Sequence, residues 1–202
     1  MPTSNRIVTA ESVPPTVKFG TPTVTAWFSE TLTPYWIEEA LSAQGDASAS
    51  GRRKEVIFAV AASESFLVEW TRDDVFERNV KACAAYFLAR EHQPVLERWK
   101  ELPKNFEEVR LISAAPDFGS SKAWPEFTSL VSTRNALVHG SYSRPRATEG
   151  LSGKNPPLSP QDLLSKRPGW AVQVVARIAL ELCTAAGTPP PDWAIRHAPA
   201  AA

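Results

Sequence analysis

One short segment of this 202-residue chain brings together side chains that could do chemistry at neutral pH. Arg134, Asn135 and His139 lie within six residues, near the end of a largely apolar run that Gly140 closes. Histidine exchanges protons near pH 7, and arginine offers a permanent positive charge with a fork of donors that matches phosphate or carboxylate. This combination is suited to moving protons and stabilising negative charge at one place.

Helical spacing indicates what these side chains face. Arg134 lies four residues after Leu130 and seven after Phe127, so it projects from the stripe that should be buried, and a buried guanidinium requires an anionic partner. Asn135 lies four residues before His139 and shares its face, where its amide could orient the imidazole. Arg134 and His139 diverge by about 140° on a regular helix. A shared substrate would lie across the helix end, or a second subunit would complete the site.

Proline positions indicate the elements that hold this segment, because a proline inside a helix costs about 3 kcal/mol. None of the 18 prolines lies between Tyr35 and Gln93. Apolar residues recurring at three and four predict helices over residues 52–72, 74–90, 94–102, 121–140 and 170–186, with Pro103 ending the third. A short helix follows Pro34 and stops at Gly45. The sequence therefore predicts an all-α bundle of four to five main helices with an extended N-terminal arm.

The same pattern predicts three parts along the chain. Residues 1–50 form an N-terminal arm with one short helix, and residues 46–51 are a small flexible linker. Residues 51–187 form the helical domain. Residues 188–202 form a mobile tail rich in proline and alanine.

Composition narrows the function classes. The 22 basic residues equal the 22 acidic residues, so any phosphate binding must be local. Cys83 and Cys183 are too few for a disulfide framework and are not spaced for a metal site, which favours the cytoplasm. No run of about 18 apolar residues predicts a membrane span. Glycine-rich phosphate loops and zinc motifs are absent from the sequence, so we expect neither a cofactor nor a metal.

The segment from Arg134 to His139, with asparagine after the arginine and glycine after the histidine, resembles the R-x4-H signature of the HEPN (higher eukaryote and prokaryote nucleotide-binding) superfamily. Residues 62–70, ASESFLVEW, look like the early helix of these domains. The resemblance covers residues 52–186 and implies an all-α homodimer in which both subunits line one cleft. Many members are metal-independent endoribonucleases of defence or toxin-antitoxin systems. Others have lost catalysis and act as nucleotide-binding, protein-binding or dimerisation modules.

The resemblance implies a role for each residue of the segment. His139 would move protons during attack by a 2′-hydroxyl, and Arg134 would stabilise the negative charge that develops on the phosphate. Asn135 would bind phosphate or orient His139, and Glu64 would hold Arg134 or tune the histidine. The alternatives are a structural ion pair for Glu64, and a helix end at which His139 caps carbonyls and Arg134 pairs with a buried acid.

The residues after the motif complete the comparison with the superfamily. Toxin-type members often carry a tyrosine two residues after the histidine, which a partner nucleotidyltransferase can modify. Here that position is Ser141, and Tyr142 comes one residue later. Arg144 and Arg146 are candidates to contact the RNA backbone, or are ordinary surface charges. The sequence thus predicts a cytoplasmic homodimeric endoribonuclease that a partner protein could neutralise, with a catalytically silent binding module as the alternative.

Overall fold

The structure is a computed structural model that describes residues 31–75, 78–79, 93–139 and 157–198. Every element in these ranges is a helix. The main ones are α1 (Thr33–Ser42), α2 (Ala49–Trp70), α4 (Val95–Glu108), α5 (Trp124–Val138) and α7 (Trp170–Ala186). Shorter elements are η1 (Ala43–Gly45), η2 (Thr71–Val75), α6 (Pro160–Ser165) and α8 (Asp192–His197). The predicted all-α bundle of four to five main helices is confirmed. Residues 1–30 of the expected N-terminal arm and most of the helix expected over residues 74–90 lie outside the described residues.

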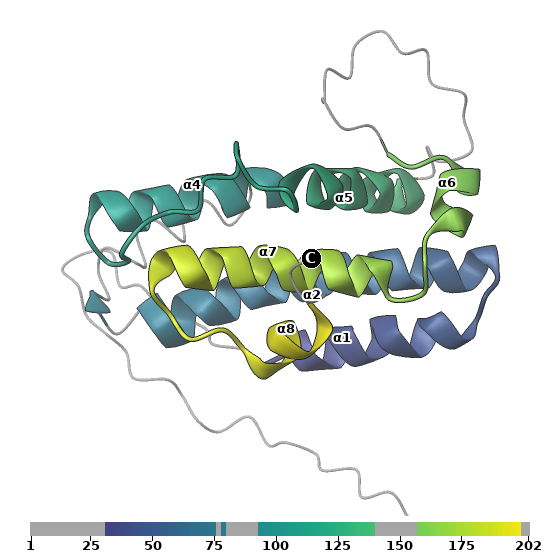
Figure 1. Ribbon diagram of the computed structural model, residues 1–202, viewed down its shortest axis with the longest axis horizontal. Coiled ribbons are helices and arrows are strands. Elements are labelled where there is room, and N and C mark those ends of the chain that lie inside the picture. The colour runs from purple at the N-terminus through teal and green to yellow at the C-terminus, as the bar shows by residue number, and fades with distance from the viewer. Residues whose placement is uncertain (1–30, 76–77, 80–92, 140–156, 199–202) are drawn as a thin grey trace, which may run out of the picture. The chain divides into compact units, whose positions relative to one another are not determined.

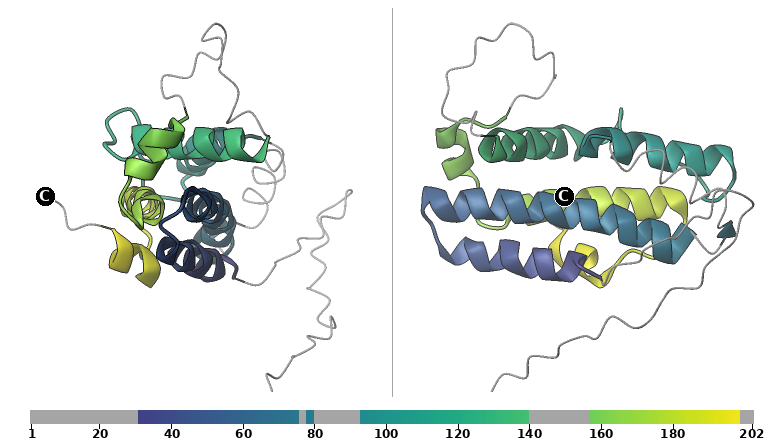
Figure 2. Two further views of the ribbon diagram at one scale, coloured as in Figure 1. Left: turned by 90° about the vertical axis from the view of Figure 1, so that its right-hand side faces the viewer. Right: turned by 180° about the vertical axis from the view of Figure 1, so that it is seen from behind.

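Helix α2 is the element that most of the others contact. It packs against α1, α5 and α7, and α8 packs against α7. Figures 1 and 2 show α4 and α5 on one side of the α2–α7 pair, with α1 and α8 on the other side. Trp99 of α4 stacks on Phe66 of α2 at 6.0 Å between ring centroids, and meets Phe127 of α5 edge-on at 5.3 Å. These aromatic contacts fix α5 against α2 and α4.

Helix α2 starts earlier than the apolar pattern predicts. The hydroxyl of Ser48 accepts hydrogen bonds from the backbone N–H groups of Ser50 (3.1 Å) and Gly51 (3.3 Å), so serine acts as the N-cap. The expected linker over residues 46–51 is therefore reduced to a short connection between η1 and Ala49. Helix α1, which the sequence assigns to the N-terminal arm, lies against α2 and belongs to the compact unit that starts at Thr31.

Helix α4 continues through Pro103, where the sequence predicts its end. The ring nitrogen of Pro103 has no hydrogen to donate, so the helix loses one backbone hydrogen bond. Trp99, Leu102 and Phe106, from the turns on both sides of the proline, are almost fully buried. Burial of each such side chain stabilises the fold by about 1.5–3 kcal/mol. Together they outweigh the cost of about 3 kcal/mol for an interior proline.

The structure describes the expected tail over residues 188–202 as far as Ala198, and this part contains the short helix α8. The hydroxyl of Thr188 accepts a hydrogen bond from the indole N–H of Trp70 at 3.0 Å. Trp193 on α8 is only 7% exposed and meets the ring of Phe66 edge-on, with centroids 5.5 Å apart. One large aromatic side chain thus anchors a segment whose proline content suggests disorder.

Gly51 provides a test of the packing at the start of α2. The carbonyl oxygen of Asp46 lies 1.9 Å from the position that a Cβ at Gly51 would occupy. Gly51→Ala should therefore lower the free energy of unfolding by about 1–3 kcal/mol, because the backbone must shift. Gly45→Ala is the control, since its Cβ would meet nothing within 4 Å. Denaturant unfolding followed by circular dichroism measures both, and equal stabilities would contradict the close approach.

Candidate functional site

Helix α5 presents the motif at its C-terminal end. The hydroxyl of Ser121 accepts hydrogen bonds from the backbone N–H groups of Ala123 (3.1 Å), which is the N-cap residue of the helix, and Trp124 (2.9 Å), which is its first residue. The helix ends with His139 as its C-cap. The residues that α5 buries in the core are Trp124, Phe127, Leu130, Val131, Thr133 and Ala136. Core packing therefore holds α5 in place, and with it the motif at the C-terminal end of this helix.

Arg134 is joined to Glu64 of α2 by an ion pair in which Nη2 donates to Oε1. The side chain of Arg134 is 22% exposed and that of Glu64 is 31% exposed, so both groups have lost much of their water. Desolvation lowers the pKa of Arg134 from its ordinary value. The expectation that a partly buried Arg134 needs an acid, with Glu64 as the first candidate, is confirmed.

Asn135 contacts the arginine rather than the histidine. Its side-chain oxygen accepts a hydrogen bond of 3.0 Å from Nη1 of Arg134. No hydrogen bond joins the side chains of Asn135 and His139 within the part of the chain that the structure describes. Helical spacing suggested that Asn135 orients the imidazole of His139. In this structure Asn135 instead holds the guanidinium group of Arg134.

His139 lies exposed at the end of α5. Its backbone N–H donates to the carbonyl of Asn135 at 3.0 Å, as in the helical turns before it, while the imidazole is left accessible to a ligand. Together with the fixed guanidinium of Arg134, it gives the helix end the two kinds of group that the motif predicts.

Arg98 of α4 is a further site residue that the sequence pattern did not reveal. Its Nη2 lies 3.9 Å from Oε2 of Glu64, so two guanidinium groups face one carboxylate. Its side chain is 16% exposed, and desolvation lowers its pKa. The available signal was its position directly before Trp99 and three residues after Val95, beside the buried face of α4. That position predicts a half-buried charge but not the helix that would supply its partner.

Leu158, near the start of the described segment 157–198, contacts α5 at Thr133, the residue before Arg134. The backbone N–H of Leu158 donates to the hydroxyl of Thr133 at 2.9 Å, and that hydroxyl donates to the carbonyl of Ser129 at 2.7 Å. This contact places the start of the segment leading to α6 next to the motif. The other predicted site residues, Tyr142, Arg144 and Arg146, lie outside the described residues.

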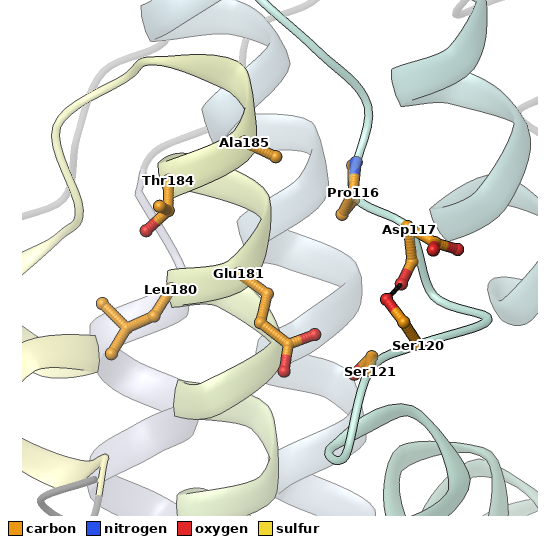
Figure 3. A pocket seen from close by; sticks show the side chains of 8 residues that line it. All are labelled: Pro116, Asp117, Ser120, Ser121, Leu180, Glu181, Thr184 and Ala185. Atoms are coloured by element: carbon orange, nitrogen blue, oxygen red, sulfur yellow. Dashed lines mark hydrogen bonds between the residues drawn. The ribbon is translucent and has the colours of Figure 1, made fainter.

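A cavity of about 400 Å³ lies at the opposite end of α5 from the motif. It is formed by the loop before α5 and the C-terminal half of α7, as Figure 3 shows. Its lining residues are Pro116, Asp117, Ser120, Ser121, Leu180, Glu181, Thr184 and Ala185. The length of α5, about 22 Å at 1.5 Å per residue, separates this cavity from His139. The cavity and the motif are therefore two distinct features of the molecule.

No group of three or more potential metal ligands occurs among the described residues. Within the same ranges, every helix is too short or too polar to cross a membrane.

Comparisons with known proteins give no relative for this chain: no family model, no curated protein and no solved structure matches it. The resemblance to the HEPN superfamily therefore rests on the residues of the chain itself, namely the spacing from Arg134 to His139 and the helix that carries Glu64.

The contact between Arg134 and Glu64 can be measured by a double-mutant cycle with Arg134→Gln and Glu64→Gln. We expect a coupling energy of about 1–2 kcal/mol, because both side chains are partly buried. The control pair is Arg177 and Glu126, which joins α7 to α5 and is 31% and 40% exposed. Its coupling should stay below about 1 kcal/mol, as for surface pairs. Equal coupling in the two cycles would show that Glu64 holds Arg134 no more firmly than a surface partner does.

Proposed function

We propose that this chain is a metal-independent endoribonuclease of the HEPN type that acts in the cytoplasm. The observation that carries the proposal is the half-buried guanidinium group of Arg134, which hydrogen bonds to Glu64 and Asn135 hold in place. Five residues later, at the end of the same helix, His139 presents an accessible imidazole. A fixed cation and an accessible proton carrier at one helix end are the two groups that cleavage by a 2′-hydroxyl needs.

The proposed reaction is an internal transfer at phosphorus. A base removes the proton of the 2′-hydroxyl, the 2′-oxygen attacks the adjacent phosphorus, and the bond to the 5′-oxygen breaks. The products are a 2′,3′-cyclic phosphate and a 5′-hydroxyl that has received a proton. His139 carries the protons, and Arg134 stabilises the negative charge on the non-bridging oxygens through charge-assisted hydrogen bonds.

The proposed site contains two copies of the chain. Arg134 and His139 are five residues apart and diverge by about 140° around α5, so one copy presents only part of a site. A twofold axis beside the end of α5 would place two arginines and two histidines around one groove. One histidine could then remove the proton while the other returns one. RNA is the proposed substrate, and a partner protein that covers this groove would neutralise the enzyme.

A second function is supported by the hydrogen bonds of Arg134 itself. Both terminal nitrogens of the guanidinium already donate to groups of the same chain, Glu64 and Asn135. An arginine engaged in this way suits a structural or binding site in which no reaction occurs. The alternative is therefore a catalytically inactive HEPN module that binds a nucleotide or a partner protein in the same groove.

The nuclease proposal predicts that the purified protein cleaves single-stranded RNA in the presence of a chelator and leaves 2′,3′-cyclic phosphate ends. His139→Ala and Arg134→Gln should each abolish cleavage, while His139→Ala lowers the free energy of unfolding by no more than about 1 kcal/mol. Arg177→Gln is the matched control, because it also breaks an ion pair with α5 but lies away from the motif. Gel analysis with end-group labelling gives the result, and absence of cleavage by the wild-type protein would favour the binding module.

The assembly proposal predicts a homodimer at micromolar concentration. Val138 is a large apolar residue that is 56% exposed beside His139, which is the position that a twofold interface at this helix end would cover. Val138→Glu should shift the protein toward the monomer, because a carboxylate would be buried without a partner. Light scattering after gel filtration measures the mass, and a monomeric wild-type protein would contradict the shared site. Ile195→Glu is the control, since Ile195 is equally exposed on α8.

A further inference from the structure

The cluster of Arg98, Arg134 and Glu64 carries an excess of positive charge. Two guanidinium groups from α4 and α5 face a single carboxylate from α2, which leaves a net charge of +1 on partly buried groups. Leaving such a charge without a counter-ion is unfavourable when water is partly excluded. The cluster therefore favours one additional anion.

Arg98 retains the donors that such an anion would use. Oε1 of Glu64 is bonded to Arg134, and Oε2 lies 3.9 Å from Nη2 of Arg98, which is beyond hydrogen-bond distance. No side-chain N–H of Arg98 makes a hydrogen bond in the described part of the chain, and its Nε is buried without an acceptor. Arg177 also has an unpaired Nε, but its terminal nitrogen is bonded to Glu126. Arg98 is thus distinguished by terminal N–H groups that make no hydrogen bond within the described ranges, and these groups, not the buried Nε, are the donors open to a ligand.

The helices that carry the two arginines are held in place before any ligand binds. Arg98 directly precedes Trp99, which is fully buried between Phe66 of α2 and Phe127 of α5. Arg134 is held by Glu64 and lies in the last two turns of the same helix as Phe127. A ligand that contacts both guanidinium groups would therefore not have to order the helices that carry them.

We propose that Arg98 and Arg134 together bind one phosphate group, with Arg98 supplying the free donor fork. The planar fork of arginine matches two oxygens of a phosphate, and each such charge-assisted hydrogen bond is stronger than a neutral one. The substrate class rests on the proposed function, in which the ligand is a phosphodiester of a bound RNA strand. Binding of that phosphodiester does not require cleavage and can be measured separately.

The test uses a single-stranded 2′-O-methyl RNA oligonucleotide, which lacks the attacking hydroxyl and stays intact. Fluorescence anisotropy over a salt series gives the affinity and its salt dependence. Arg98→Gln should weaken binding about tenfold and reduce the slope of log K against log salt by about 0.7, the value for one lost phosphate contact on a single strand. Arg177→Gln removes one positive charge elsewhere and should leave the affinity and the slope unchanged. Equal effects of the two variants, or no RNA binding by the wild-type protein, would overturn the proposal.

A second measurement tests the same site in the wild-type protein, with the Arg98 side chain intact. Titration of the wild-type protein with inorganic phosphate should shift the NMR resonance of the Arg98 Nε–H group saturably, whereas chloride at equal ionic strength should not. Arg98→Lys serves to assign that resonance. Absence of a saturable shift would overturn the proposal even if Arg98→Gln proves unstable.

The outcomes separate this inference from the nuclease proposal. If RNA is not cleaved but binding depends on Arg98, the nuclease proposal is wrong and the phosphate site stands. If RNA is cleaved but Arg98→Gln changes neither affinity nor salt slope, the phosphate site is wrong and the nuclease proposal stands.

Discussion

Two buried glutamates of α2 hold the ends of neighbouring helices. Glu55 accepts a hydrogen bond of 3.1 Å from the backbone N–H of Ala171 at the start of α7. Glu69 accepts hydrogen bonds from the N–H groups of Leu32 (2.6 Å) and Thr33 (2.9 Å) at the start of α1. The first N–H groups of a helix have no partner within it, and a carboxylate there also meets the positive end of the helix dipole. The packing of α1 and α7 therefore depends on acids supplied by α2.

The spacing of three glutamates along α2 decides where the site can form. Glu69 lies about 40° from Glu55 around the helix, whereas Glu64 lies about 180° from Glu55. Glu55 and Glu69 are committed to α7 and α1, so Glu64 is left to face the arginines of α4 and α5. Glu55 is only 2% exposed, and this burial raises the pKa of its carboxyl group. The central helix thus serves both the fold and the candidate site.

Most of the helical architecture could be predicted from the sequence, because apolar periodicity and helix stops are local properties. The helix predicted over residues 170–186 agrees with α7, and the helix predicted over residues 121–140 agrees with α5 (Trp124–Val138) to within three residues at each end. The positions of helices were predicted wrongly or missed where contacts between residues far apart in the sequence outweigh the local conformational preference of proline. Pro103 lies inside α4 because buried residues on both sides hold the helix, and Trp193 anchors a proline-rich segment that has no long apolar pattern.

The sequence by itself determined that the fold is helical, that the motif lies at a helix end, and that Arg134 needs an acid. These conclusions follow from spacing along one chain and from the cost of burying a charge. Only the tertiary structure decided that Glu64 is the acid, that Arg98 shares it, and that Asn135 bonds to Arg134. The physical reason is that contacts between helices depend on how each helix is rotated and shifted against its neighbours, which core packing sets and no single helix encodes.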